Sequence, residues 1–220
     1  MSYMYYISIL LIYIVMKTNI YYINLDKRTD RKDDFLKQFE SVKYSKDNII
    51  RVKAIEHIIG TLGCLSSHIK ALKLALKDSH PYAIICEDDF TFRNQKLDFE
   101  ELLGNLINSK VDWDVMLLSH NPITSLISPT DDKQICKIEN SQTTSGYIIK
   151  KSYIKTLLSL FEKLYESTKN YKQTPPHNLT MDIYWKQLQK TDKWYITNPV
   201  LGYQRMSYSD IEKRITDYNC

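Results

Sequence analysis

Three consecutive carboxylates, Glu87, Asp88 and Asp89, stand directly after the apolar run Tyr82 to Cys86. Such a run is typical of a short buried strand in a parallel sheet, and ligands of open α/β sheets bind beyond the carboxyl ends of the strands. Neighbouring carboxylates repel one another unless positive charge lies among them, and oxygen ligands suit hard cations such as Mg²⁺ or Mn²⁺. The triplet therefore predicts a divalent-metal site that holds a phosphate-bearing substrate. The alternative is a strand followed by a solvated acidic turn.

The spacing within the triplet gives each carboxylate a different expected task. In an extended backbone, residues two apart project to the same side, so we expect Glu87 and Asp89 to share one metal ion. Asp88 is expected to point away from that ion and to meet a ribose hydroxyl of the substrate.

A second group of residues follows the first expected strand, Asn19 to Leu25. Arg28 and Arg31 stand three apart near a helix start, where guanidinium groups bind phosphate oxygens in pairs and the helix N-terminus adds backbone donors. The amide of Asn24, at the strand end, suits a nucleobase or ribose edge by hydrogen bonding. The alternative is a solvated loop of mixed charge.

Two further segments carry groups suited to acid–base or ligand chemistry. Gly60 and Gly63 are expected to frame a tight turn that lets a ligand approach the backbone closely, and His68 follows on a helix, either as a structural residue or as a ligand. Asp182 lies in the first turn of another expected helix, where the helix dipole favours a carboxylate. Its functional alternative is a general base that deprotonates an acceptor hydroxyl. The competing candidates for this base are Asp112, Asp114 and His177, and His177 is also a candidate for the metal shell.

Composition excludes several classes of protein. The chain has 220 residues, of which 43% are hydrophobic and 25% charged, as is ordinary for a soluble domain with a sizeable core. The net charge of +4, without a basic block interleaved with aromatic residues, gives no indication of nucleic-acid binding. None of the four cysteines forms a CxxC pair, so a zinc site of that kind is not expected. Cys64 and Cys86 are expected to be small buried hydrophobic residues.

Apolar periodicity predicts alternating strands and helices, hence βαβ units in a single α/β domain over residues 17–220. Expected strands cover residues 19–25, 49–54, 82–87, 114–119, a short segment from Tyr147, and 194–200. A first expected helix follows the charged turn 26–34, with Phe35, Phe39 and Val42 on its buried face. Further expected helices cover residues 65–76, 97–107, a segment reaching Tyr165, and 180–190 with Thr180 as the cap. Expected loops cover 128–133 and 169–178, and the tail from Gln204 is polar.

The first sixteen residues are set apart as an apolar extension, because residues 3–16 are almost entirely apolar. Fourteen residues are short for a membrane span, which needs about 20. Three interpretations stay open: a dispensable extension before a start at Met16, a segment that gives weak membrane association, and a packed strand or helix.

Taken together, these segments resemble glycosyltransferase family 25, the family of lipopolysaccharide-core sugar transferases and procollagen galactosyltransferases. Ile20 to Arg31 resembles its opening strand and turn, Gly63 to Leu72 its Gly-Cys-x-x-Ser-His-x-x-Ala-Leu helix, and Glu87-Asp88-Asp89 its acidic metal-binding motif. Thr144 to Ile149 is similar to a later strand, and the Asp182 segment and Gln204 to Ile211 fall where its last blocks lie. The chain departs from the family pattern at Thr61, where an acidic residue is frequent, and at Lys150, where a small polar residue is frequent.

The resemblance implies a GT-A type fold with a Rossmann-like, mixed and mostly parallel central sheet. It also implies that a sugar, galactose or glucose, moves from a UDP-sugar donor to a hydroxyl of a glycan or protein acceptor, with inversion at the anomeric carbon and with Mn²⁺ or Mg²⁺ as cofactor. By the same analogy Glu87 and Asp89 lie at the metal, whereas the donor lies near Asn24, Leu25, Arg28, Arg31 and Asp88.

Two rival functions stay open at this stage. A metal-dependent phosphohydrolase or nucleotidyltransferase uses the same acidic strand end but releases phosphate or pyrophosphate, and a non-catalytic nucleotide-sugar-binding module binds UDP without turnover. The expected location is cytoplasmic or peripheral to a membrane, and the secretory-pathway lumen stays open because Asn178-Leu179-Thr180 is a glycosylation sequon.

Overall fold

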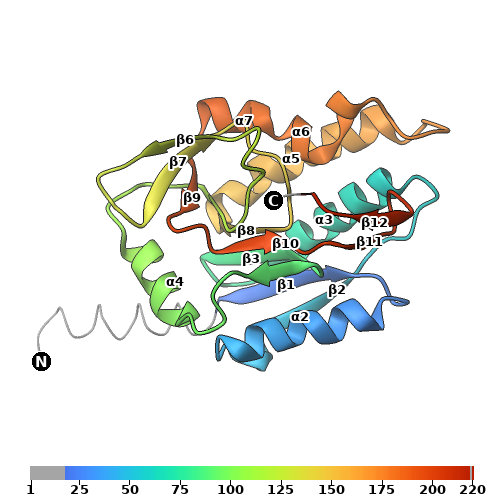
Figure 1. Cartoon of the computed structure of the whole chain (residues 1–220). Helices are drawn as coiled ribbons and strands as arrows, with labels where there is room; N and C mark the ends of the chain where they lie inside the picture. The colour runs from blue at the N-terminus through green and yellow to red at the C-terminus, as the bar shows by residue number, and fades with distance from the viewer. Residues whose placement is uncertain (1–17, 219) are drawn as a thin grey trace, which may run out of the picture.

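The centre of the molecule is an eight-stranded sheet with the strand order β2-β1-β3-β8-β5-β9-β7-β6 (Figure 1). The computed structural model describes residues 18–218 and Cys220. Strands β8 and β7 run opposite to the rest of the sheet. The strands are β1 (Asn19–Asn24), β2 (Ile49–Lys53), β3 (Tyr82–Glu87), β5 (Val115–Leu117), β6 (Leu126–Pro129), β7 (Ile135–Glu139), β8 (Gly146–Lys150) and β9 (Trp194–Thr197). The predicted α/β class, with a mixed and mostly parallel central sheet flanked by helices, is confirmed.

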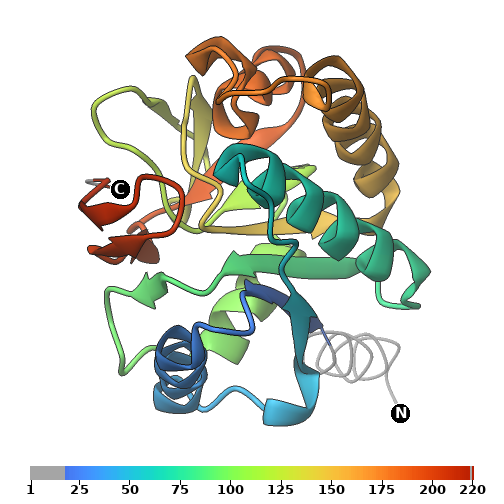
Figure 2. The same ribbon diagram turned by 90° about the vertical axis from the view of Figure 1, so that its right-hand side faces the viewer.

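Helices cover both faces of this sheet, as the edge-on view in Figure 2 shows. Side chains alternate across a strand, so Ile85 packs on one face and Ile84 on the other. The first face carries α3 (Gly60–Lys77), α5 (Lys151–Thr168), α6 (Met181–Tyr184) and α7 (Lys186–Thr191), and the second carries α2 (Thr29–Ser41) and α4 (Phe99–Asn108). Two 3-10 turns, Lys46–Asn48 and His177–Leu179, complete the helical elements of the described chain.

Local apolar patterns predicted the first half of the fold well. The strand over 82–87 is confirmed as β3, and the strand over 19–25 as β1, one residue shorter. The apolar face predicted for the first helix is also confirmed, because Phe35, Phe39 and Val42 are buried. The Phe35 ring stacks on Tyr22 of β1 with ring centroids 4.5 Å apart, which holds α2 against the sheet.

Several predicted elements differ from the structure. Gly60 and Gly63 do not frame a turn, because α3 begins at Gly60 and both residues are helical. The segment 128–133, predicted as a loop, contains the end of β6 and the turn to β7. The helix predicted for 180–190 is two short helices, α6 and α7, and the Thr180 side chain makes no cap hydrogen bond.

The chain after β9 also forms strands that were not predicted. Strand β10 (Gly202–Gln204) pairs with β4 (Phe90–Phe92), which directly follows the acidic triplet, and β11 (Ser207–Ser209) pairs with β12 (Arg214–Thr216). These strands are only three residues long, too short for alternation to be visible in the sequence. They carry the end of the chain across the carboxyl edge of the sheet.

Gly63 is required by a close contact rather than by its backbone conformation. A Cβ atom on residue 63 would lie 2.7 Å from the carbonyl oxygen of Ile55, a backbone atom of the loop that leads into α3. We expect Gly63→Ala to lower the free energy of unfolding by about 1–3 kcal/mol, as overpacking does, in a urea titration. Gly104→Ala, inside α4, is the matched control and is expected to be neutral or stabilising by up to about 1 kcal/mol. Equal effects of the two substitutions would contradict the contact argument.

The hypotheses on residues 1–16 lie outside the described residues. In the described part of the chain, no helix combines the length and the apolar character that a membrane crossing requires.

Candidate functional site

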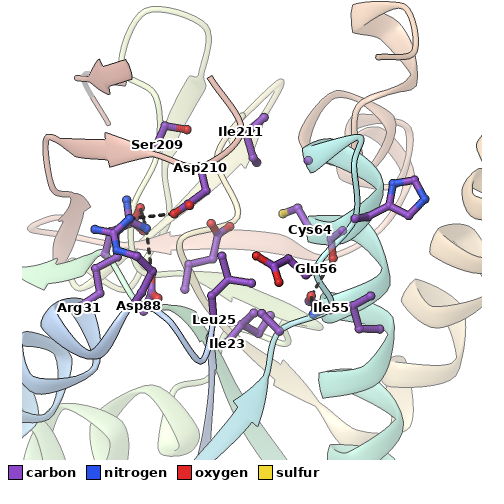
Figure 3. Close-up of a pocket in the computed structure, with 18 of the residues that line it drawn as sticks. Ile23, Leu25, Arg31, Ile55, Glu56, Cys64, Asp88, Ser209, Asp210 and Ile211 are labelled. Atoms are coloured by element: carbon purple, nitrogen blue, oxygen red, sulfur yellow. Dashed lines mark hydrogen bonds and ion pairs between the residues drawn. The ribbon is translucent and has the colours of Figure 1, made fainter. Parts of the chain in front are cut away.

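A cavity of about 490 Å³ opens at the carboxyl ends of β1, β2 and β3, within the size range of small-molecule sites. Three layers of structure form its walls: the strand ends with Leu25 and the acidic triplet, the first turns of α3 with Cys64 and His68, and the C-terminal segment with Asp210 and Ile211. Figure 3 shows Arg31 and Asp88 on one side of this space and Cys64 of α3 on the other. The site therefore lies where a parallel sheet places its ligands.

The acidic triplet does not continue the extended geometry of β3. The strand ends at Glu87, and Asp88 and Asp89 form a turn before β4. The premise that Glu87 and Asp89 project to one side as alternate strand residues is therefore wrong. Asp88 and Asp89 converge instead on one nitrogen, Nη1 of Arg31, at 2.9 and 3.1 Å. Arg31 thus supplies part of the positive charge that the sequence analysis assigned to a metal ion.

Of the three carboxylates, that of Asp89 has a buried oxygen atom with no hydrogen-bond partner among the described residues. Its side chain is buried, Oδ2 accepts hydrogen bonds from Arg31 and Gln204, and Oδ1 has no partner among the described residues. Burial, with repulsion from Glu87, raises the pKa of Asp89 to about 7, although Arg31 opposes this. A buried carboxylate oxygen without a partner fits a hard divalent cation, which supplies both the missing contact and the missing charge.

Glu87 faces the opposite side of the cavity. Its Oε1 accepts a hydrogen bond of 2.6 Å from Thr144 and lies 3.4 Å from Nε2 of His68. Burial acts to raise the pKa of this carboxyl, but the interactions with His68 and Thr144 outweigh burial and lower it. His68 is completely buried, and its other ring nitrogen lies 3.2 Å from the hydroxyl of Tyr147. The contacts with His68 and Thr144 therefore favour the ionised form of Glu87. The complete burial of His68 fits the structural hypothesis for this residue, and a role as a ligand stays a prediction.

Asn24 does not line the cavity; it is buried and holds a residue of the site in position. Its amide nitrogen donates to Asp88 and to the carbonyl oxygen of Arg28, and its amide oxygen accepts from Arg51. The side chain is buried, with 1% of the residue surface exposed, so the contact with a nucleobase expected for Asn24 has no free polar atom to make it. Asn24 instead orients Asp88, whose pKa is raised by burial.

The two predicted arginines lie at the cavity and are both bound to the C-terminal segment. Arg28 forms ion pairs with Asp30 and with Asp210, each through a different nitrogen. Arg31 donates through Nη2 to Ser207 and to the carbonyl oxygen of Tyr208. A segment some 180 residues away in sequence therefore closes over the turn after β1, and no local signal in the turn indicates this contact.

Asp182, in α6, is not among the residues that line the cavity. Its carboxylate acts electrostatically on the thiol of Cys64, which does line the cavity. In the described part of the chain, no hydrogen bond or salt bridge holds this carboxylate. The role of Asp182 as the general base stays a prediction.

The topology argues against two of the other candidate bases. Asp112 and Asp114 precede β5, which runs parallel to β3, so they lie at the amino edge of the sheet, opposite the cavity. Asp112 is bound there by Lys150 and Lys193. His177 is exposed in a 3-10 turn and, like Asp182, does not line the cavity, so the cavity lining does not decide between these two.

Several cavity residues were not predicted. Lys27 comes from the turn after β1 and Ser67 from α3. The others come from the loop before α3 and from the C-terminal segment: Ala54, Ile55, Glu56, His57, Ile58, Ser209, Lys213 and Tyr218. Cys64 was expected to be a buried hydrophobic residue, but it is partly exposed and lines the cavity. The only signal for the C-terminal group is the resemblance of Gln204 to Ile211 to a family block.

Comparisons with known proteins complete the description of the site. No curated protein matches the chain. Among solved structures, a glycosyltransferase involved in the glycosylation of the major capsid of PBCV-1 aligns with 82% of this chain and 91% of its own, at 9% identity and a TM-score of 0.43. The model of glycosyltransferase family 25, described as an LPS biosynthesis protein, matches residues 58–172, just over half of the chain, including α3 and the acidic triplet. The chain is therefore a glycosyltransferase and belongs to glycosyltransferase family 25.

Proposed function

We propose that the chain transfers a sugar, galactose or glucose, from a UDP-sugar to a hydroxyl of a glycan or protein acceptor, with inversion and with dependence on Mn²⁺ or Mg²⁺. The observation that carries this proposal is the buried Asp89 carboxylate, whose Oδ1 has no partner in the described chain and which faces a cavity that also holds Arg28 and Arg31. Acidic and guanidinium groups in one cavity suit a diphosphate bound through a cation.

In this proposal the donor lies along the strand ends. Asp89, with Glu87 or Asp88, would hold the ion, and the bound ion would supply Lewis-acid stabilisation of the leaving diphosphate. Arg28 and Arg31 stabilise the same charge directly, after exchanging part of their contacts with Asp210 and Ser207. Leu25 and Ile23 give the donor an apolar surface.

The acceptor reacts from the α3 side. Asp182 takes the proton of the acceptor hydroxyl as its oxygen forms a bond to the anomeric carbon. The bond between that carbon and the phosphate oxygen breaks on the opposite face, and UDP leaves with the bonding electron pair. Attack from the opposite face inverts the configuration.

The first test is release of UDP by the full chain from a panel of UDP-sugars, with Mn²⁺, with Mg²⁺ and with EDTA. We expect one donor to be hydrolysed slowly without an acceptor, and this hydrolysis to stop in EDTA. Release of inorganic phosphate or pyrophosphate instead of UDP would identify a phosphohydrolase or nucleotidyltransferase. Binding of UDP and Mn²⁺ in a calorimetric titration without turnover of any donor and acceptor pair would identify a binding module.

The role of Asp182 is tested by Asp182→Asn. We expect kcat to fall at least about a hundredfold, because proton transfer by a positioned base contributes about 10²–10⁴, while the affinity for UDP and Mn²⁺ stays within about threefold. Asp112→Asn, at the opposite edge of the sheet, is the control and should leave kcat unchanged. Full activity of Asp182→Asn, or an equal loss in the control, would exclude Asp182 as the base.

A further inference from the structure

One group of side chains at the cavity has the composition of a transition-metal site rather than a hard-cation site. Cys64, His68 and Glu87 each present one ligand atom, and these three atoms lie within 4.8 Å of one another. Cys64 and His68 are four residues apart on α3 and therefore share one face of the helix, toward the end of β3. Cys64, His68 and Glu87 all line the cavity, so an ion has a path from solvent.

Other side chains hold two of these ligands in position. Nδ1 of His68 lies 3.2 Å from the Tyr147 hydroxyl, so when this nitrogen donates to Tyr147, the lone pair of Nε2 points toward Glu87. The Thr144 hydroxyl donates to Oε1 of Glu87 at 2.6 Å and fixes that carboxylate. A histidine ligand whose second nitrogen is hydrogen-bonded, beside an anchored carboxylate, is the arrangement found around protein-bound zinc.

The electrostatic surroundings favour a cation at this place. The ligand atoms of Cys64 and Glu87 lie within 4.8 Å of each other, and Asp88 and Asp89 line the same cavity. The negative charge of these carboxylates attracts a divalent ion, and a bound ion would compensate both Glu87 and a Cys64 thiolate.

We propose that Cys64, His68 and Glu87 form a binding site for Zn²⁺ or a similar transition metal, in which case Asp88 rather than Glu87 joins Asp89 at the hard cation. On binding, the Cys64 thiol loses its proton to solvent and its sulfur coordinates the ion, together with His68 Nε2 and a Glu87 oxygen. Mixed sulfur, nitrogen and oxygen ligands suit Zn²⁺ and Co²⁺, whereas Mg²⁺ and Mn²⁺ prefer oxygen. The fourth position faces the cavity, where water or a ligand completes a tetrahedron.

The test is a titration of the reduced full chain with Co²⁺, followed by absorption spectroscopy. Coordination by a thiolate produces a sulfur-to-cobalt charge-transfer band in the near ultraviolet, which oxygen and nitrogen ligands do not produce. We expect one equivalent of Co²⁺ to give this band, and one equivalent of Zn²⁺ to remove it. The band should disappear in Cys64→Ser and persist in Cys136→Ser, in Cys220→Ser and in Asp89→Asn.

A second variant tests the hydrogen bond that holds the Glu87 carboxylate in position. Thr144→Val removes the hydrogen bond to Glu87 without changing a ligand, and we expect the affinity for Zn²⁺ to fall about tenfold to a hundredfold. Circular dichroism of each variant confirms that it is folded. A band that survives Cys64→Ser, a band that follows Cys220 instead, or the absence of a band at saturating Co²⁺ would each overturn the proposal. None of these results depends on donor turnover, so they are distinct from a failure of the proposed transferase reaction.

Discussion

Asp89→Asn is expected to slow donor turnover strongly and, at the same time, to make the metal-free protein more stable at pH 8. Loss of a charged metal ligand removes stabilisation of the leaving diphosphate, and we expect kcat to fall about 10²–10³-fold. The stability gain arises because the ionised Asp89 carboxylate is buried with one oxygen unpaired. A residue that lowers stability in order to act on a ligand is common at functional sites.

The direction of the pH dependence follows from the two protonation states. The pKa of Asp89 is about 7 in the folded chain, against 3.8 for the unfolded reference. Below pH 4 both states hold the proton and Asp89 costs nothing. Between these pKa values only the folded state keeps the proton, so stability falls as the pH rises, by up to about 4 kcal/mol above pH 7. Asparagine cannot ionise, so the variant should gain stability at pH 8 and not at pH 4.

Urea titrations at pH 4 and pH 8 in EDTA measure this difference directly. Asp131→Asn, which replaces an exposed carboxylate, is the control and should change stability by less than about 0.5 kcal/mol at either pH. Mn²⁺ should stabilise the wild-type chain and leave Asp89→Asn unchanged. A variant that is less stable than the wild type at pH 8 would contradict the burial argument for Asp89.

The second large effect is expected for Arg31→Met. The Arg31 side chain is 11% exposed and contacts the side chains of Asp88 and Asp89, which are 9% and 5% exposed. Removing one partner of a buried ion pair leaves buried charge without compensation and costs about 3–5 kcal/mol. The pKa values of both carboxylates should rise further, so the variant should lose more stability than the wild type as the pH rises from 5 to 8.

Arg28→Met is the matched control for this substitution. Arg28 also forms two ion pairs, but the side chains of its partners Asp30 and Asp210 are 63% and 26% exposed, so solvent screens both interactions more and the expected cost is smaller, about 1 kcal/mol. Mn²⁺ should restore part of the stability of Arg31→Met, because the ion replaces the lost positive charge. If the loss in Arg31→Met were the same at pH 5 and pH 8, packing of the side chain rather than its charge would be responsible.

The sequence alone determined the elements that bury a regular apolar face. Strand β3 was predicted because an uninterrupted apolar run can only be buried on both faces, and α2 because Phe35 and Phe39 recur with helical spacing. It was also predictable that the acidic triplet and Arg31 lie close together, because the carboxyl ends of parallel strands meet at one edge of the sheet. Both groups follow such strand ends, and they are in contact there. The family resemblance rests on these same segments.

Only the tertiary structure decided how the polar groups are paired. Sequence spacing placed Glu87 beside Asp89, but the turn after β3 directs Glu87 to His68 and Asp89 to Arg31. Asn24, expected at the ligand, is bonded to Asp88 inside the protein, and the C-terminal segment covers Arg28 through Asp210. The burial of an apolar face follows from the spacing of apolar residues along the chain, so the sequence predicts it. Hydrogen bonds and ion pairs between distant segments depend on orientation within about 3 Å, which exists only once the chain is folded.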